Sequence, residues 1–494
     1  MVGAQALGQD EILLSIFPAN IPEEELRWGP VKLNEVLQRS LRLEARVFDI
    51  EGKHAREVLK HCKWPIIAVW GRETKLADNV FVPGRVKRVY LRKDDPNVIG
   101  FLGSSEMLDV YPIPYKWLSR NEDKYDQFKV EKGWVLVSCS GTIGNLAYVS
   151  DTLARYKVSQ HAIRIVSDYS GYIYSFLKTD IGKALVKTNI YGAVINEIEP
   201  EHFAEIEIPN PPETLKRQIH DLIVRSYALR DESNNLLDKA KEILIDALKL
   251  PPLESLEPSY FEGNAELRNY TVKLSDLVGR LDGSYHVPLI DSIQCQLKRE
   301  AIEITTIGDP RISEQIILPG RFTRVYVEEG QGTVFFGGKQ LFELDPANKK
   351  YLSLSYHGDR IKRELLLKKN MILITRSGTI GKVALVPEHW VQWVANEHVI
   401  RIEPASPDIA GYLYVFLATD YGRELIARFT YGAVVDEIDD YHVSQVPIPL
   451  LKDVDIQAEI NRLALEANSK RTEAYLAEQE ALRKTNEEVI NAII

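Results

Sequence analysis

Hydrophobic residues recur every seven positions along a stretch of the chain that contains no proline or glycine. These positions are Leu215, Leu222, Leu229, Leu236, Ile243 and Leu250. The intervening core positions are Ile219, Ser226, Ser233, Ala240 and Ala247. A heptad sustained in this way predicts a coiled-coil helix, and the small residues between the leucines would let a partner helix approach closely.

A second stretch with the same texture follows Pro447 and Pro449 and continues to Ile494. Its apolar positions begin with Ile456, Ile460 and Leu463. A helix over residues 215–250 would be about 54 Å long. We expect the two helices to pack antiparallel as a spacer with a domain at each end.

Elsewhere the pattern alternates between short β-rich runs and turns. Val135–Ser138 and Ile372–Thr375 are dense in β-branched and aliphatic residues, as are Ala162–Ile165 and Val399–Ile402, which predicts strands. Tyr172–Lys187 instead has helical spacing of its apolar positions,. These segments predict α+β domains.

The chain contains an internal duplication. Gly171–Ile198 returns as Gly411–Ile438, Ser140–Gly144 as Ser377–Gly381, and Pro83–Tyr90 as Pro319–Tyr326. Three matches in the same order indicate two copies of one domain rather than a solenoid. The predicted organisation is therefore an arm (1–30), a first domain (31–212), a spacer helix (213–252), a second domain (253–452) and a C-terminal spacer helix (453–494).

Composition narrows the function. The 494 residues carry a net charge of −10, which disfavours non-specific polyanion binding but leaves local basic patches open. We expect no signal peptide or membrane span. Cys62, Cys139 and Cys295 lack metal-ligand spacing and fit a reducing cytoplasm,.

A set of motifs in combination resembles the specificity subunit of type I restriction–modification systems. In the second half these are Asn370–Lys382, Tyr431–Ile438, Pro447–Pro449 and Gln457–Ile460. Their counterparts are Gly133–Asn145, Tyr191–Ile198, Pro209–Pro212 and Gln218–Ile219. The chain departs from the family pattern at Trp134, at Cys139 and at Asn145, which stands where Lys382 keeps the usual basic residue.

The resemblance implies two target-recognition domains, each reading one half of a split site in double-stranded DNA. It implies that the paired helices set the gap between the half-sites and dock two methyltransferase subunits, which bind S-adenosylmethionine. In a restriction complex, nuclease subunits that use ATP and Mg²⁺ would join. The chain itself would hold no cofactor or metal, would catalyse nothing and would act in the cytoplasm.

The candidate DNA contacts are basic residues beside turns and aromatics. They are Arg85, Lys87, Arg88, Arg92, Lys93, Arg321, Arg324, Lys349, Lys350 and Arg376. Arginine can bond guanine edges bidentately, whereas lysine more often serves phosphate. The arginines that recur in both copies would serve phosphate or structure, and sequence choice would lie where the copies differ, such as Ser104–Asp123 and Lys339–Lys362.

Other chemistry finds little support. Asn210–Pro212 resembles the start of an adenine-methyltransferase loop, but Glu213 stands where an aromatic residue would stack on the flipped base,. His161 and His398 are equivalent, as are His202 and His442, and none of the four sits in a metal-ligand cluster. The alternative to a DNA-reading subunit is a scaffold that holds protein partners at a fixed separation, and the third possibility is an enzyme with a novel active site.

Overall fold

The computed structural model describes residues 31–38, 43, 45–190, 196–256, 270–277, 279–347, 349–432 and 436–492. The predicted arm (1–30) lies outside these residues, as do parts of both Tyr-Gly-Ala-Val segments (191–195 and 433–435).

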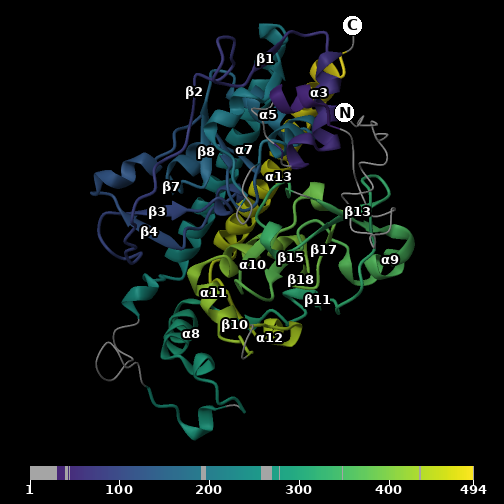
Figure 1. Cartoon of the computed structure of the whole chain (residues 1–494). Helices are drawn as coiled ribbons and strands as arrows, with labels where there is room; N and C mark the ends of the chain where they lie inside the picture. The colour runs from purple at the N-terminus through teal and green to yellow at the C-terminus, as the bar shows by residue number, and fades with distance from the viewer. Residues whose placement is uncertain are drawn as a thin grey trace, which may run out of the picture.

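Two long helices run side by side through the molecule (Figure 1): α7 (Glu213–Ala247) and α13 (Val454–Lys484), which a π-helical segment, η12 (Thr485–Ile490), extends. The hydroxyl of Ser226 donates to the carbonyl O of Ala474 at 2.7 Å, and Arg471 Nε donates to Ser233 Oγ at 3.1 Å. Residue numbers thus rise along one helix as they fall along the other. The predicted antiparallel pairing is confirmed.

The first copy of the duplicated domain surrounds the N-terminal part of α7. Its helices are α2 (Leu33–Gln38), α3 (Ile50–Lys60), α4 (Asp151–Ala154), α5 (Ser170–Lys178) and α6 (Asp180–Lys187). Its strands are β1 (Ile66–Ala68), β2 (Asn79–Phe81), β3 (Val98–Leu102), β4 (Lys116–Ser119), β5 (Val135–Ser138), β6 (Leu146–Tyr148), β7 (Lys157–Val158), β8 (Ala162–Val166) and β9 (Glu207–Pro209).

The second copy has a similar order of elements, with the additional strand β12 (Tyr326–Val327). Its helices are α8 (Pro288–Glu300), α9 (Leu354–Arg360), α10 (Pro407–Leu417), α11 (Asp420–Ala427) and α12 (Asp440–Ser444). Its strands are β10 (Glu303–Thr306), β11 (Ser313–Ile317), β12 (Tyr326–Val327), β13 (Gly332–Phe336), β14 (Lys350–Ser353), β15 (Ile372–Thr375), β16 (Val383–Leu385), β17 (Val394–Ala395), β18 (Val399–Pro404) and β19 (Pro447–Leu450).

The sheets of the two copies have matching topologies. The order β2-β8-β5-β6 in the first copy corresponds to β11-β18-β15-β16 in the second, and both are antiparallel four-stranded sheets. A second sheet, β4-β3-β7, corresponds to β12-β14-β13-β17. The prediction of two duplicated α+β domains joined by a coiled coil is confirmed, whereas the domain boundaries stay a prediction.

One predicted helix is two helices in the structure. The spacing over Tyr172–Lys187 suggested a single helix, but the chain turns at Thr179, between α5 and α6. The Thr179 hydroxyl donates to the carbonyl O of Phe176 at 2.6 Å and accepts from Gly182 N at 3.1 Å. A threonine in this position satisfies an N–H at the start of the new helix, and Thr419 does the same in the second copy.

The helix pair makes its closest contact along the small residues rather than the leucines. Ser226, Ser233 and Ala240 are completely buried. Among the predicted seam residues, Ile219, Leu229, Ile460 and Leu463 are buried, whereas Leu215, Leu222, Leu236, Ile243 and Ile456 are half-buried. These half-buried residues lie beside the helix contact and pack against the cores of the domains. The contact between α7 and α13 is therefore centred on the small residues of the heptad and not on its leucines.

Each copy has its own hydrophobic core at one end of the coil. In the first copy, Ile219 and Ile223 of α7 pack with Val489 and Ile490 of η12. In the second, Leu244 of α7 packs with Ile460 and Leu463 of α13. The domains therefore sit toward opposite ends of the helix pair, as the duplication predicts, although they also contact one another beside its middle.

The two ends of the described chain are joined through the first copy. Cys62 Sγ donates to the carbonyl O of Val489 at 3.1 Å, and Trp64 Nε1 donates to that of Glu488 at 3.1 Å. The second copy repeats the arrangement at the other end, where Gln296 Nε2 donates to the carbonyl O of Leu248 at 3.0 Å. Within the described residues, no helix is long and apolar enough to cross a membrane.

Candidate nucleic-acid interface

Three segments that are far apart in the sequence meet at one polar cluster in each copy. In the first copy, Arg85 Nη2 lies 3.4 Å from Glu197 Oε1, and Glu197 forms a β-bridge to Ser140 in the Gly-Thr-Ile-Gly turn. In the second copy, Arg321 Nη2 lies 3.7 Å from Glu437 Oε1, and Glu437 bridges to Ser377. The duplication has thus preserved a site built of an arginine, a glutamate and a serine turn.

A second arginine and a histidine extend each cluster. Arg88 donates to Gln160 Oε1 at 3.3 Å, whereas its counterpart Arg324 forms an ion pair with Glu397. The serine hydroxyl of the turn lies 2.6 Å from His161 Nδ1 in the first copy and, between Ser377 and His398, 2.9 Å in the second. We call the two assemblies the Arg–Ser–His clusters. They comprise Arg85, Arg88, Ser140, Gln160, His161 and Glu197 in the first copy, and Arg321, Arg324, Arg376, Ser377, Glu397, His398 and Glu437 in the second.

The turn between the paired strands is held by a side chain beneath it. Ser138 Oγ donates to the carbonyl O of Thr142 at 2.5 Å, and Thr375 Oγ1 donates to that of Thr379 at 2.5 Å. Gly141 and Gly378 have φ values of 74° and 77°, which favour glycine, and a Cβ at either would meet nothing within 4 Å,. The turn is thus a fixed, open tip beside the exposed arginines.

The charge state of each cluster follows from its surroundings. Burial and the cations Arg88 and Arg85 lower the pKa of His161, so the ring is held neutral. Burial acts to raise the pKa of Glu397, but its hydrogen bonds and Arg324 outweigh this effect and leave the pKa lowered. The glutamate is therefore a carboxylate, and Arg324 is its counter-ion.

The copies differ at two positions of the clusters: Gln160 stands in place of Glu397, and Cys139 stands in place of Arg376. Arg376 Nη2 donates to Glu437 Oε2 at 2.7 Å, so Glu437 contacts two arginines. The equivalent residue of the first copy is Cys139, whose side chain is buried and whose pKa is raised to about 11, chiefly by burial. The second cluster therefore has one more cation at this place.

Cation–aromatic pairs flank the clusters. The ammonium of Lys350 lies 5.0 Å from the ring centroid of Tyr326, and that of Lys116 lies 5.3 Å from the ring centroid of Tyr90. Lys116 was missed in the sequence. Its place between Tyr115 and Trp117 was the signal that could have found it.

Several predicted DNA contacts are engaged elsewhere. Lys93 Nζ lies 2.8 Å from Asp420 Oδ2 in the other copy, and Lys349 Nζ lies 2.5 Å from Asp345 Oδ1 beside a cavity. Arg92 is paired with Asp94 at 3.0 Å on the same loop. Lys87 is exposed. The clusters bring together only Arg85, Arg88, Arg321, Arg324 and Arg376 of the ten candidates.

The two segments expected to select the DNA sequence lie against each other, which the sequence did not predict. Val110 N donates to the carbonyl O of Phe342 at 2.8 Å, so Ser104–Asp123 and Lys339–Lys362 contact each other across the two copies. Part of their divergence therefore belongs to an interface between domains.

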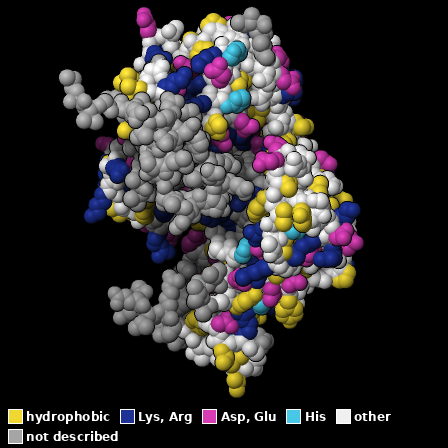
Figure 2. Space-filling model, turned by 45° about the vertical axis from the view of Figure 1, so that its right-hand side comes forward, with side chains coloured by type: hydrophobic (Ala, Val, Ile, Leu, Met, Phe, Trp, Pro, Cys, Tyr) yellow, Lys and Arg dark blue, Asp and Glu magenta, His cyan; other side chains and the backbone are white. Residues whose placement is uncertain are grey.

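Among the described residues, no group of three or more His, Cys, Asp or Glu side chains could hold a metal ion. Positive and negative side chains are interspersed over the face in Figure 2.

The model of the type I restriction modification DNA specificity domain matches residues 87–238 and 346–463. No curated protein matches. A solved type I restriction–modification S subunit from M. genitalium is 11% identical, with 88% of this chain and 96% of that chain covered and a TM-score of 0.34. The HsdS subunit from Thermoanaerobacter tengcongensis is 14% identical, with coverages of 83% and 97% and a TM-score of 0.26.

Proposed function

The chain belongs to the type I restriction–modification DNA specificity family, and from that premise we propose that its two Arg–Ser–His clusters each engage one half of a bipartite DNA site. The protein is a DNA sequence-recognition subunit and is not itself a catalyst. The observation that carries the proposal is the recurrence of the same cluster, built from the same three segments, in both duplicated domains.

The ion pairs of the clusters suit a role in phosphate binding. Arg85 and Arg321 have side chains that are 79% and 75% exposed. An exposed ion pair contributes only about 0–1 kcal/mol, so a DNA phosphate can replace the glutamate as the partner of the guanidinium. The glutamate keeps each arginine oriented until DNA arrives.

The half-buried arginine of the second cluster suits a different role from the exposed arginines. Arg376 has a side chain that is only 15% exposed and is fixed by Glu437, which suits a contact of defined geometry. Arginine in a fixed orientation can bond a guanine edge bidentately. Cys139 cannot do so, and the two domains therefore differ in what they can read.

The coil spaces the two clusters and supplies a surface for other subunits. In the proposed complex, two methyltransferase subunits that bind S-adenosylmethionine dock on the helix pair, and nuclease subunits that use ATP and Mg²⁺ join them in the cytoplasm. A coil of 35 residues in α7 is about 52 Å long, and it exceeds the ~34–36 Å of one DNA turn.

The test is DNA binding by the subunit in complex with its methyltransferase, across salt concentrations. Arg85→Ala and Arg321→Ala should each weaken binding to all sequences about equally and reduce the slope of log K against log salt by about 1. Arg376→Ala should weaken binding to the native site more than to random DNA. Lys298→Ala, which removes an exposed cation on α8, is the matched control.

A scaffold without direct DNA readout would behave differently. In that case the three arginine variants would bind as the wild type does, and the salt slope would belong to the methyltransferase alone.

A further inference from the structure

The two recognition domains contact each other directly, beside the middle of the coil. Residues 107–115 follow β3 in the first copy, and residues 341–347 follow β13 in the second. We call these two segments the clasp. Val110 and Tyr475 pack with Leu229, Leu344 and Ala474, so each side of the clasp rests on the coil as well as on its counterpart.

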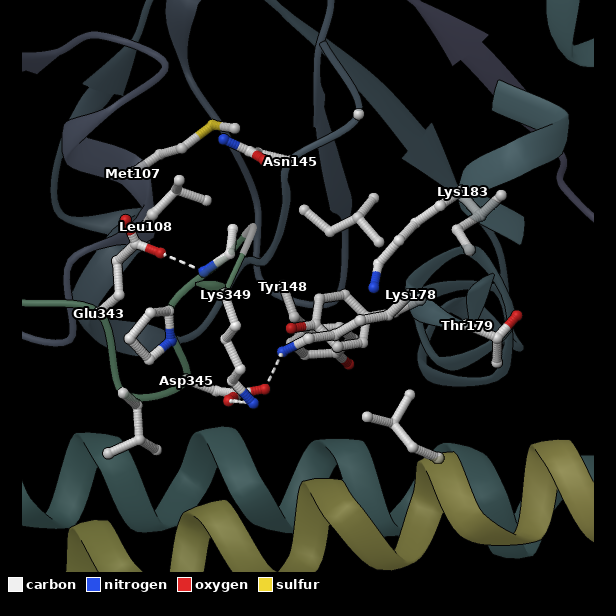
Figure 3. Close-up of a pocket in the computed structure, with 18 of the residues that line it drawn as sticks. Met107, Leu108, Asn145, Tyr148, Lys178, Thr179, Lys183, Glu343, Asp345 and Lys349 are labelled. Atoms are coloured by element: carbon white, nitrogen blue, oxygen red, sulfur yellow. Dashed lines mark hydrogen bonds and ion pairs between the residues drawn. The ribbon is translucent and has the colours of Figure 1, made fainter. Parts of the chain in front are cut away.

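Buried charges anchor the second copy's half of the clasp to the first copy. Asp345 Oδ2 lies 3.3 Å from Lys178 Nζ of α5 (Figure 3), and the Asp345 side chain is only 7% exposed. Lys178 also forms an ion pair with Glu478 of α13, which in turn pairs with Arg230 of α7. One carboxylate of the second domain is thereby tied to the first domain and, through it, to both coil helices.

The first copy's half of the clasp is held by hydrogen bonds to α7 and by a contact with Lys382 of the second copy. Asn234 of α7 donates from Nδ2 to the carbonyl O of Val110 at 2.7 Å, and the Tyr111 hydroxyl bonds Asp238 of α7. The Lys382 ammonium lies 5.1 Å from the ring centroid of Tyr115 and 4.7 Å from that of Phe342.

This last contact links the clasp to the turns of the proposed DNA interface. Lys382 ends the Gly-Thr-Ile-Gly turn of the second copy, where its N–H donates to Thr375 Oγ1 at 3.1 Å. Its counterpart, Asn145, lines the cavity between the copies instead. The replacement of the usual basic residue by Asn145 therefore has a structural consequence. The turn that ends at Lys382 contacts Tyr115 of the other domain, whereas Asn145 lines the cavity.

The contact is local rather than continuous. A cavity of about 630 Å³ separates the copies next to the clasp and is lined by residues of both domains and of α13. Each domain is therefore held by its core on the coil and by its segment in the clasp, and an exposed ion pair between Lys93 and Asp420 also joins the two copies outside the clasp.

We propose that the clasp fixes the relative orientation of the two recognition domains and so restricts the subunit to one spacing between half-sites. This inference rests on the proposed function. The coil alone sets the separation of the domains, but a domain attached only at the coil can rotate about that attachment. A second attachment point removes this freedom, and with it the tolerance for DNA in which the half-sites are one base pair closer or farther.

The test variant is Asp345→Lys, which places a cation against Lys178. Asp291→Lys, at an exposed position of α8, is the matched control for the same change of charge. Complexes with the methyltransferase subunit are assayed on DNA in which the half-site spacing varies one base pair at a time. The wild type and Asp291→Lys should methylate one spacing, whereas Asp345→Lys should methylate the neighbouring spacings at rates within about tenfold of the native one. A folded Asp345→Lys complex that keeps the single spacing would overturn the proposal.

A second measurement tests the clasp without DNA. Spin labels are attached at the native Cys295, which is exposed, and at Glu131→Cys in the first copy. The distance distribution should be narrow in the wild type and broad in Asp345→Lys, and an equally narrow distribution in the variant overturns the clasp. Failure of all the complexes to methylate any spacing would reject the proposed function, while the label distances would still decide on the clasp.

Discussion

At the scale of single residues, buried arginines shape both domains. Arg164 and Arg401 are completely buried in equivalent strands, and their guanidinium groups donate to backbone carbonyls. Burial lowers the pKa of Arg164 to about 10 and that of Arg401 to about 9. The β-branched and aliphatic residues of Ala162–Ile165 predicted the strand. Nothing local showed that its arginine points inward, because that depends on carbonyls at the end of β7.

Glu478 is the residue on which most buried charge converges. It lies on α13 with a completely buried side chain, bonds Lys178 and Arg230, and accepts from the Tyr174 hydroxyl at 2.8 Å. Burial acts to raise the pKa of Glu478, but the two cations lower it further than burial raises it. The stability it contributes is therefore present above its unfolded pKa and is lost as the pH falls through its folded pKa.

Glu478→Gln should reduce the free energy of unfolding by about 3–5 kcal/mol at neutral pH, because it leaves two buried cations with one carboxylate fewer. Chemical denaturation measures this change. Glu480→Gln, at a position on the same helix whose side chain is 39% exposed and pairs with Arg483, should cost no more than about 1 kcal/mol. Equal losses in the two variants would contradict the importance of the buried network.

At the scale of secondary-structure elements, the crossing of the domain helices over the coil sets the packing. The N-terminal end of α10 approaches α13 so closely that Gly411 N donates to Asn461 Oδ1 at 2.7 Å. A Cβ at Gly411 would lie against the carbonyl O of Asn461 and 3.0 Å from the Cβ of Ala464. Gly171 meets His220 of α7 in the same way in the first copy.

Gly411→Ala should therefore destabilise the protein by about 1–3 kcal/mol, as overpacking does. Gly358→Ala in α9 is the matched control, since a Cβ there meets nothing within 4 Å, and it should be neutral or stabilising by up to about 1 kcal/mol. Thermal or chemical denaturation compares the two. A Gly411→Ala protein as stable as the wild type would show that the helices can separate without cost.

The sequence was informative about elements with strong local signals and less so about their faces. The runs Val135–Ser138 and Ile372–Thr375 are strands with the bounds that their composition indicated. The coil was also predictable, but the face that α7 turns toward α13 was not. Leu222 and Leu236 follow the heptad, yet they pack against the cores of the domains beside the coil. The break at Thr179 escaped prediction because the apolar spacing continues across it.

At the scale of the whole molecule, the duplication predicted the two domains and their placement toward the ends of the coil, but not their contact. Repeated motifs identify what the copies share, whereas an interface between the copies uses residues in which they differ. For the same reason, the sequence showed only some of the residues that form the Arg–Ser–His clusters. Arg85 and Arg321 recur in the sequence, but Glu197 and Glu437 join them only through the fold.

The clasp should respond to pH. Burial and then the carboxylate of Glu343 raise the pKa of Asp109 to about 7, although Lys382 acts against them and Glu106 adds to them. Burial raises the pKa of Glu343 to about 7, with Asp345 adding to the effect and Lys178 opposing it. Both carboxyl groups have a higher pKa in the folded protein than in the unfolded chain, so the closed clasp binds protons more tightly. The stability that this proton binding contributes is lost as the pH rises through about 7.

The distance distribution between labels at Cys295 and Glu131→Cys should therefore be narrower at pH 5 than at pH 8.5. In Asp109→Asn/Glu343→Gln, both side chains are neutral at either pH, and the distribution should be narrow throughout. Asp123→Asn, an exposed change of the same kind on the first copy, should behave as the wild type does. A wild-type distribution that is identical at the two pH values would contradict the expected pH response.

The direct contact between the copies bears on how such a protein can evolve. Two readers joined only by a rod could be exchanged by recombination between genes, each exchange yielding a new combination of half-sites at once. Here Val110 and Phe342, and Lys178 and Asp345, come from different halves of the gene. A half inherited from another lineage would arrive without its matched counterpart, so new specificities should arise most readily by changes within a half, or by exchanges between relatives that share these pairs.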